Sequence, residues 1–314
     1  MKLLPYFEDR FDDAVSKKTC QFVYEQASEF LGELLEYSDG MFEFCLQIGN
    51  SRHQHVDRVL QGLSRHNLAY LDSIKVLLAS GCAEGCEPLL RSILESTFGI
   101  AHIVEEKSEE RALAYKFARI TRHIKHLRRG DLTHSAGKQL HTELANDAYS
   151  ANVLSQVPAG MAVHASQLEA KVAADPAFAP IVAEWNRVKG KRQGDPEWYS
   201  LFGGANNIRE LAKKLRWQSM YDFLYRDYSN AVHAGNTVER ALTHGNELCP
   251  LRHPSKYLDA FSFAYCVTIN GLEKLLGFYD VAKQEEMRKV ILGVFEPKHQ
   301  NIRAMIDEAF KGYK

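Results

Sequence analysis

Apolar residues recur along most of the chain at intervals of three and four, the spacing of one face of an α-helix. The clearest stripes are Leu89, Leu90, Ile93, Leu94, Phe98 and Ala101; Leu113, Phe117, Ile120, Ile124 and Leu127; and Tyr221, Leu224, Tyr225, Tyr228 and Val232. Further helices are expected near 11–36, 64–79, 163–174, 206–215, 255–277, 280–293 and 299–311. No segment alternates with period two as a half-buried strand does, so the pattern predicts an all-α protein.

The pattern is weakest between about 130 and 205. This stretch holds four of the nine prolines and a turn-rich Gln-Gly-Asp-Pro sequence at 193–196. A domain linker is one interpretation, but the stretch also contains large aromatic side chains that a flexible tether does not need, namely Trp185, Trp198, Tyr199 and Phe202. We therefore expect an insertion that packs on the helical core. The predicted division is an N-terminal helical segment at 1–60, a core at 61–245 that carries the insertion, and a C-terminal helical extension at 246–314.

Composition places the chain among ordinary globular proteins. It has 45% hydrophobic and 25% charged residues, and 39 basic against 40 acidic side chains give a net charge of −1. This balance argues against a general polyanion binder, although a local basic patch can hide inside it. No apolar run approaches the roughly 20 residues needed to span a bilayer, and the first nine residues do not resemble a signal peptide. We expect a cytoplasmic protein with no membrane partner.

The sequence offers little support for metal or nucleotide chemistry. The six cysteines lack the paired spacing of a disulfide framework or zinc ribbon. Cys82 and Cys86 would share a helix face and, with a third ligand, could hold a metal, but buried free thiols are the commoner outcome. Glycine-rich phosphate loops, serine-hydrolase elbows and His-Glu-x-x-His pairs are absent from the sequence. We expect no metal and no cofactor.

The third apolar stripe carries the most distinctive polar residues. Seven helical residues turn by about 700°, so Arg226 and His233 fall on one strip of the predicted helix, with Ser229 and Asn230 between them. A guanidinium can clamp a phosphate and an imidazole can move protons near neutral pH. This pairing suits phosphodiester chemistry. A helix-end pair that only bonds neighbouring carbonyls is the alternative, and the spacing does not decide between them.

Two sequence blocks extend this interpretation. Ile208-Arg-Glu-Leu-Ala-Lys-Lys-Leu215, followed by the segment from Met220 to Ala234, resembles the C-terminal signature of a bacterial helical family catalogued only as a domain of unknown function. Leu89-Leu-Arg91-Ser-Ile-Leu-Glu95 is similar to the other marker of that family, and the resemblance covers roughly residues 60–245. The segment from Arg226 to His233 also resembles the active motif of the HEPN (higher eukaryote and prokaryote nucleotide-binding) superfamily.

The HEPN resemblance implies a helical bundle and a metal-independent endoribonuclease, commonly a toxin or antiviral effector that acts as a homodimer. His233 would then serve the proton transfers around the attack of a 2′-hydroxyl, and Arg226 would stabilise charge on the phosphorane. Asp227 matches the polar position after the arginine and would orient one of them. Ser229 and Asn230 match no fixed catalytic role, and their place near substrate is a geometric inference. One histidine cannot easily act as both base and acid, which favours a composite site from two protomers.

Two further groups are candidate site residues. Arg91 and Glu95 are spaced for a helical ion pair inside an apolar helix; either Glu95 orients Arg226 or His233 from a neighbouring helix, or the pair is structural. The segment 115–130 carries six positive charges and no acid, at Lys116, Arg119, Arg122, Lys125, Arg128 and Arg129. Three interpretations of this basic face stay open. It is simply solvated, it contacts RNA phosphates, or it pairs with acidic residues of the protein such as the glutamates at 105–110.

The leading prediction is therefore a HEPN-like helical bundle that cleaves RNA through an Arg-x6-His motif. The HEPN resemblance also implies a partner, either an antitoxin or a member of a defence complex. The alternative is a non-catalytic helical protein that binds a nucleotide or RNA, or that serves as a scaffold in a defence complex. Retention of the arginine, the polar residue and the histidine together favours the enzyme.

Overall fold

The computed structural model describes residues 14–49, 54–145, 147, 160–191, 193–232 and 254–311. Within these ranges the regular elements are all helices, with no β-strand, which confirms the predicted all-α class. The chain forms two compact units, one built from 1–106 and 208–314 and the other from 107–207. The predicted division at residues 60 and 245 follows other boundaries and stays a prediction.

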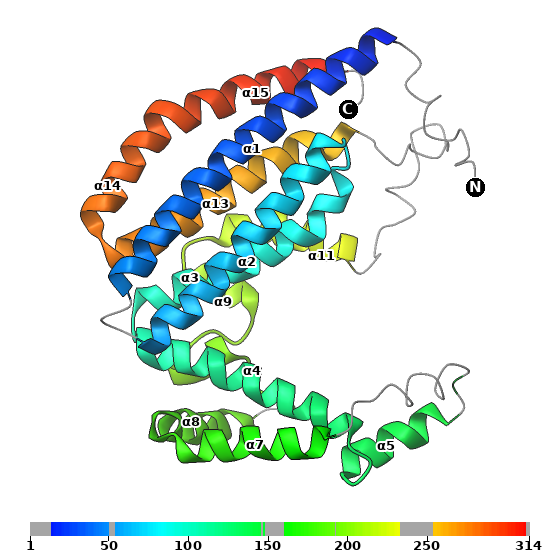
Figure 1. The fold of residues 1–314 in the computed structure, drawn as a ribbon, viewed down its shortest axis with the longest axis vertical. Helices are drawn as coiled ribbons and strands as arrows, with labels where there is room; N and C mark the ends of the chain where they lie inside the picture. Colours follow the sequence, from blue (N-terminus) through cyan, green and yellow to red (C-terminus); the bar gives the residue numbers. More distant parts are fainter. Residues whose placement is uncertain are drawn as a thin grey trace. The chain divides into compact units, whose positions relative to one another are not determined.

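Four long helices form the centre of the first unit: α1 (Ala14–Gly49), α2 (Gln54–Ala79), α3 (Glu87–Glu105) and α13 (Tyr257–Tyr279). Each packs against the next, and α13 closes the ring by packing on α1 (Figure 1). Fully buried side chains from all four helices fill the centre, among them Leu31, Leu34, Leu71, Ile74, Ile93, Phe98 and Phe261. The bundle therefore rests on the apolar stripes that the sequence displays.

The first two helices extend beyond their predicted ranges. α1 continues to Gly49 because Phe42 and Cys45 prolong the buried stripe, and α2 begins at Gln54 with Val56, Val59 and Leu60 buried. Burial of these side chains adds apolar contact along the whole length of the pair.

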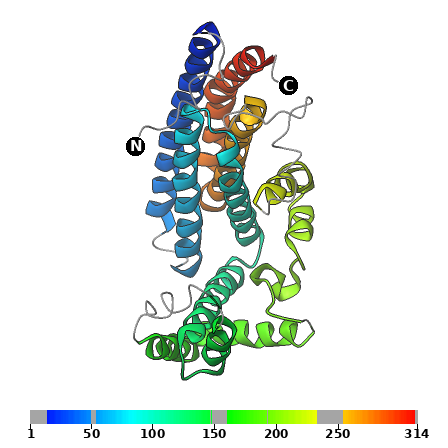
Figure 2. The same ribbon diagram turned by 90° about the vertical axis from the view of Figure 1, so that its right-hand side faces the viewer.

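The C-terminal helices lie against α1. α14 (Val281–Val290) leads through a π-helical turn (Ile291–Phe295) directly into α15 (Glu296–Ala309), which packs on α1 and α13 (Figure 2). The sequence analysis predicted two separate helices here, near 280–293 and 299–311. The structure instead places Pro297 in the first turn of α15, where a proline is tolerated.

The second unit is assembled around α4 (Ser108–Gly130). α5 (Ser135–Leu144), α7 (Met161–Ala174) and α8 (Ala179–Lys189) accompany it, with short 3-10 turns at Pro176–Phe178 and Trp198–Gly203. The Trp185 ring meets Phe117 of α4 edge-on at 5.2 Å between centroids, and Trp198 meets Tyr115 in the same way at 5.2 Å.

Among the aromatic residues of the predicted insertion, Trp185 is buried in the core of this second unit, and Trp198 and Phe202 are half-buried against it. Their partner is α4, so the compact unit begins near residue 107 rather than 130. No helix of the described ranges is long and apolar enough to cross a membrane.

Candidate functional site

The segment with the Arg226 motif folds as two successive kinds of helix. Tyr221–Tyr225 forms a π-helical turn, and α11 follows from Arg226–Val232. The π-helical turn is rare and recurs at functional sites in proteins. Since the turn ends before Arg226, the residues from Arg226 to Val232 keep the ordinary α-helical spacing that the sequence analysis assumed.

The side chains of this segment fall into two strips. One strip is exposed and consists of Phe223, Arg226, Asp227 and Asn230, at helical intervals of three and four. Phe223 is 74% exposed. The opposite strip is buried or half-buried and consists of Tyr221, Leu224, Tyr225, Tyr228 and Ser229. This strip faces α3, against which α11 packs, so the polar motif residues lie on the solvent side.

A triangle of hydrogen bonds attaches the segment to α3. The Tyr225 hydroxyl donates to Glu95 Oε1 at 2.8 Å and accepts from Arg91 Nη2 at 3.0 Å. Arg91 Nε in turn donates to Glu95 Oε1 at 3.2 Å, which is the ion pair that the spacing predicted. All three side chains have their charges or dipoles paired, so the triangle forms a complete polar contact between α3 and the π-helical turn.

Aromatic contacts strengthen the same attachment. The Arg91 guanidinium lies 4.9 Å from the centre of the Tyr225 ring, within cation–π range. The rings of Tyr221 and Tyr225 stack at 5.1 Å with 18° between their planes. Burial raises the pKa of Tyr225, so its hydroxyl keeps the proton that it donates to Glu95. The pKa of Arg91 is raised: burial opposes its charge, but the bonds to Tyr225 and Glu95 outweigh this.

Each predicted site residue can now be located. Arg226, Asp227 and Asn230 are exposed on α11, whereas Ser229 is half-buried on the strip that faces α3. His233 lies outside the described residues. Glu95 does not contact Arg226 in the described part of the chain; it binds Arg91 and Tyr225, the residue before Arg226. Among the described residues Glu95 is therefore linked to Arg226 only through the neighbouring Tyr225, and its predicted contact with His233 stays a prediction.

The Arg91 and Glu95 pair is only partly buried. Although α3 is largely apolar, the two side chains are 19% and 45% exposed. The pair lies at the edge of the packed face, where a tyrosine from the neighbouring segment reaches it. Tyr225 was not predicted as a partner because it belongs to an apolar stripe of the sequence. Its phenolic hydroxyl is the feature of the sequence that could have indicated a polar contact.

The basic helix α4 is partly neutralised by its own unit. Lys125 binds Asp195, which also binds Lys189 at 3.2 Å, and Arg128 binds Glu169 at 2.6 Å. Burial opposes the charge of Asp195, yet the hydrogen bonds from the two lysines lower the pKa of that carboxyl. Arg119, Arg122 and Arg129 remain exposed. Acidic side chains from the 160–207 region thus neutralise part of the positive charge of α4.

The cysteine pair shows no sign of a metal site. Cys86 is buried, and its thiol donates to the carbonyl oxygen of Cys82 at 3.6 Å. Burial raises the pKa of Cys86 to about 12, so the thiolate needed for metal binding is disfavoured. Across the described ranges no three His, Cys, Asp or Glu side chains gather closely enough to hold a metal ion.

Comparisons with known proteins give one match. Residues 57–247, more than half of the chain, match the family of unknown function DUF5677. This range agrees with the residues 60–245 over which the sequence resembled a helical family of unknown function, and it includes both α3 and α11. Neither the curated proteins nor the solved structures contain a significant match. The chain therefore belongs to the DUF5677 family, a family of unknown function.

Proposed function

We propose that this protein is a metal-independent endoribonuclease of the HEPN type, acting as a toxin or antiviral effector in the cytoplasm. The observation that carries the proposal is the placement of the motif: Arg226 and Asp227 are exposed at the start of α11, while Tyr225, in the turn just before them, is hydrogen-bonded to α3. Polar motif residues that face solvent from a firmly attached helix are available to a substrate.

The chemistry follows from the side chains of the motif. His233 removes the proton from a ribose 2′-hydroxyl, whose oxygen attacks the adjacent phosphorus. Arg226 stabilises the negative charge that develops on the phosphorane oxygens through paired hydrogen bonds. The bond from phosphorus to the 5′-oxygen then breaks, and this leaving oxygen needs a proton. Asp227, next to Arg226 and exposed like it, orients one of the two catalytic groups.

The need for that second proton supports a homodimer. The described part of α11 exposes a guanidinium, a carboxylate and an amide beside the motif, and none of them is a good proton donor at neutral pH. A second copy of the chain would bring a second His233, so that one imidazole acts as base and the other as acid. Dimerisation is then part of the mechanism.

RNA binding is proposed to involve α4. Arg119 and Arg122 are exposed on this helix and are free to meet phosphates, whereas Lys125 exchanges its bond to Asp195 for any contact with RNA. Contacts of this kind position an RNA without reading its sequence. Arg91 does not bind substrate in this proposal, because its hydrogen bonds go to Glu95 and Tyr225.

An RNA cleavage assay in the presence of a metal chelator tests the proposal. Wild type is compared with Arg226→Ala, His233→Ala and a control, Arg65→Ala, which removes an exposed arginine from α2 of the same unit. The expected result is cleavage by wild type and the control, and loss of cleavage in the two motif variants with unchanged circular dichroism. Growth of cells expressing each protein should follow the same order.

Cleavage that survives both motif substitutions would remove the assignment. RNA that is bound but never cut, by a folded wild-type protein, would support the other interpretation: a non-catalytic RNA- or nucleotide-binding protein, or a scaffold in a defence complex. An antitoxin would be detected as a protein that restores growth without unfolding the ribonuclease.

A further inference from the structure

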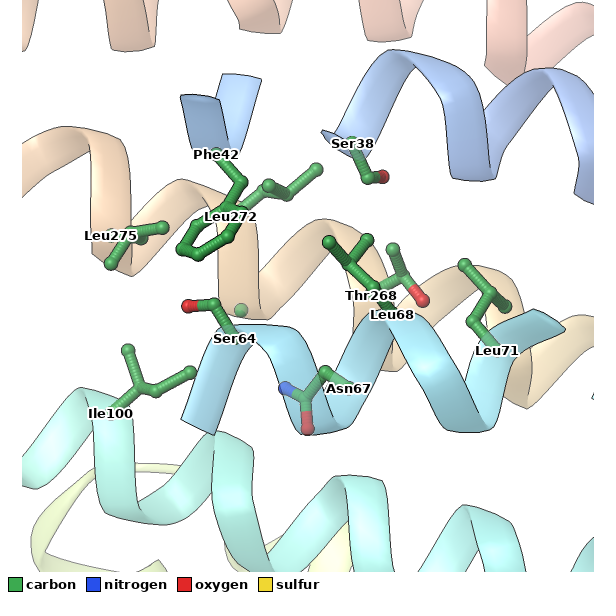
Figure 3. Close-up of a pocket in the computed structure, with 11 residues that line it drawn as sticks. Ser38, Phe42, Ser64, Asn67, Leu68, Leu71, Ile100, Thr268, Leu272 and Leu275 are labelled. Carbon is green, nitrogen blue, oxygen red and sulfur yellow. The ribbon is translucent and has the colours of Figure 1, made fainter. Parts of the chain in front are cut away.

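The cavity inside the four-helix bundle is too small for a ligand. It lies between α1, α2, α3 and α13 and encloses about 30 Å3, room for one or two waters but not for an organic molecule (Figure 3). Its lining is mostly apolar, with Phe42, Leu68, Leu71 and Leu272 among the side chains drawn there. A partner larger than water therefore does not enter the bundle at this place.

A cluster of basic side chains lies on the surface of the first unit, where α9 (Ile208–Lys214) ends. Lys213 and Arg216 are exposed, and the Arg216 N–H donates to the Lys213 carbonyl at 3.1 Å, so the two residues are one turn apart. Lys274 of α13 is also exposed, and its Nζ lies 5.6 Å from the centre of the Trp217 ring. Three cations from two parts of the chain thus meet beside Trp217. We call these three residues the basic corner.

The charge of the basic corner is not neutralised inside the described part of the protein. No hydrogen bond or ion pair engages its three cations there. Two neighbouring acids bind other side chains: Glu273 pairs with Arg288, and Asp222 accepts from Gln218 at 3.2 Å. The stretch 208–219 as a whole carries four basic residues against one acid. The corner is therefore a local positive surface that is available to an anion.

Arg216 also has a backbone conformation that favours glycine. Its φ is 61°, in the left-handed region. The Trp217 N–H donates to the Ala212 carbonyl at 2.8 Å, and this bond together with the one from Arg216 to Lys213 forms the Schellman pattern that ends α9. Glycine is the usual residue at this position, because a side chain disfavours the left-handed conformation. Strain of this kind clusters at functional sites, so we expect the Arg216 side chain to contribute something other than stability.

An exposed aromatic ring lies between the basic corner and the proposed catalytic arginine. Phe223 is 74% exposed and shares the exposed strip of its segment with Arg226. At the rise of a helix, the nine residues from Trp217 to Arg226 span about 13 Å. Proteins that bind single-stranded RNA combine cations that contact phosphates with aromatic rings on which bases stack. A base-paired strand has no free base for such a ring, so this combination favours a single strand over a duplex.

We propose that single-stranded RNA binds across the basic corner and Phe223 toward Arg226. Its phosphates contact the three cations of the corner, and one base stacks on Phe223. The inference rests on the proposed function, since it takes RNA as the partner and Arg226 as the end of the path. It gives the unit that carries the motif an RNA-binding surface of its own, separate from α4 of the second unit.

Binding is measured without cleavage, in full-length His233→Ala with a metal chelator, by the fluorescence anisotropy of a labelled single-stranded RNA at several salt concentrations. Adding Arg216→Gly should reduce the salt slope by about 0.7, the loss of one phosphate contact on a single strand. The same substitution should raise the melting temperature by about 3 °C, because glycine adopts the left-handed conformation without strain. Arg216→Lys should keep the slope. Arg216→Ala should lose the slope without the gain in stability.

Phe223→Ala separates stacking from charge. In the same background it should weaken binding of the single strand roughly tenfold and leave the salt slope unchanged, because stacking involves no counterion release. Its affinity for a duplex RNA should not change. Arg65→Ala, which removes an exposed arginine from α2 of the same unit, is the matched control and should keep both slope and affinity.

The inference is overturned if Arg216→Gly has the same salt slope as Arg65→Ala, if Phe223→Ala binds the single strand undiminished, or if His233→Ala binds no RNA. Failure of the proposed function gives a different result. RNA that binds with the expected slopes but is never cut by the otherwise wild-type protein removes the ribonuclease and supports the binding surface. Cleavage that depends on His233, with slopes that ignore Arg216, keeps the ribonuclease and removes the basic corner from it.

Discussion

Replacing Tyr225 by Phe removes one hydroxyl and so isolates the polar link between α3 and the helix that carries Arg226. Two hydrogen bonds disappear, one to Arg91 and one to Glu95, while the ring, its stacking on Tyr221 and its contact with the guanidinium remain. Arg91 and Glu95 keep each other as partners, so no unpaired buried charge results.

The magnitude follows from the exposure of the two partners. A hydrogen bond to a charged group contributes about 1.5–3 kcal/mol when buried, and the bond to Arg91, whose side chain is 19% exposed, belongs near the lower value. The bond to Glu95, 45% exposed, is reduced by solvent to about 0.5 kcal/mol. We therefore expect Tyr225→Phe to lower the free energy of unfolding by about 2 kcal/mol. For a unit of roughly 200 residues this is about 6 °C in melting temperature.

Urea and thermal denaturation followed by circular dichroism measure this loss. Tyr221→Phe is the matched control, because no hydrogen bond to its hydroxyl occurs within the described residues, and we expect a change below about 0.5 kcal/mol. A double-mutant cycle with Glu95→Gln should show coupling of about 0.5–1 kcal/mol between the two positions. If Tyr225→Phe is no less stable than Tyr221→Phe, the hydrogen-bond triangle does not hold the helix against α3.

Three other predictions concern separate parts of the molecule. Burial lowers the pKa of His299, so below about pH 6.5 this histidine binds a proton more readily in the unfolded chain than in the native one. The free energy of unfolding should therefore fall from pH 7.5 to 5.5, and it should fall less in His299→Phe. Parallel pH curves for the two proteins would contradict this. Gly137→Ala would place a Cβ 1.9 Å from a backbone carbonyl oxygen and should lower the free energy of unfolding by more than about 3 kcal/mol. Gly62→Ala has open space on α2 and should raise it by about 0.5–1 kcal/mol in the same denaturation assay. Equal effects of the two substitutions would refute the distinction. Arg119→Glu with Arg122→Glu should weaken RNA binding and reduce its salt slope by about 1.4, the loss of two phosphate contacts on a single strand; an unchanged slope in filter binding would remove α4 from the interface.

The sequence predicts the long helices well and the contacts between them poorly. Leu90, Ile93, Leu94 and Phe98 are buried on one face of α3 because a helix that packs on others must place its apolar side chains there. α5 was not predicted from the sequence. Gly137 is its only buried residue, so the helix has no stripe of apolar side chains at intervals of three and four.

The candidate site shows the same division between local and distant information. The ion pair of Arg91 and Glu95 follows from a separation of four residues on one helix. Its third member, Tyr225, lies 134 residues beyond Arg91, in a π-helical turn that contacts α3. Neither feature has a local pattern, so neither could be read from spacing alone.

The two faces of α11 also decide how Arg226 should be interpreted. A purely structural arginine would need partners within the fold, yet within the described ranges no hydrogen bond or ion pair involves Arg226, and its side chain is exposed. Surface substitutions of this kind usually change stability by less than about 0.5 kcal/mol. The residues that attach this segment lie on the opposite strip: Tyr225 is hydrogen-bonded to α3, and the buried Tyr228 ring packs edge-on against Phe263 of α13. Loss of RNA cleavage in Arg226→Ala would therefore report on chemistry, whereas loss in Tyr225→Phe would report on the position of the helix, and the two should differ in stability by about 2 kcal/mol.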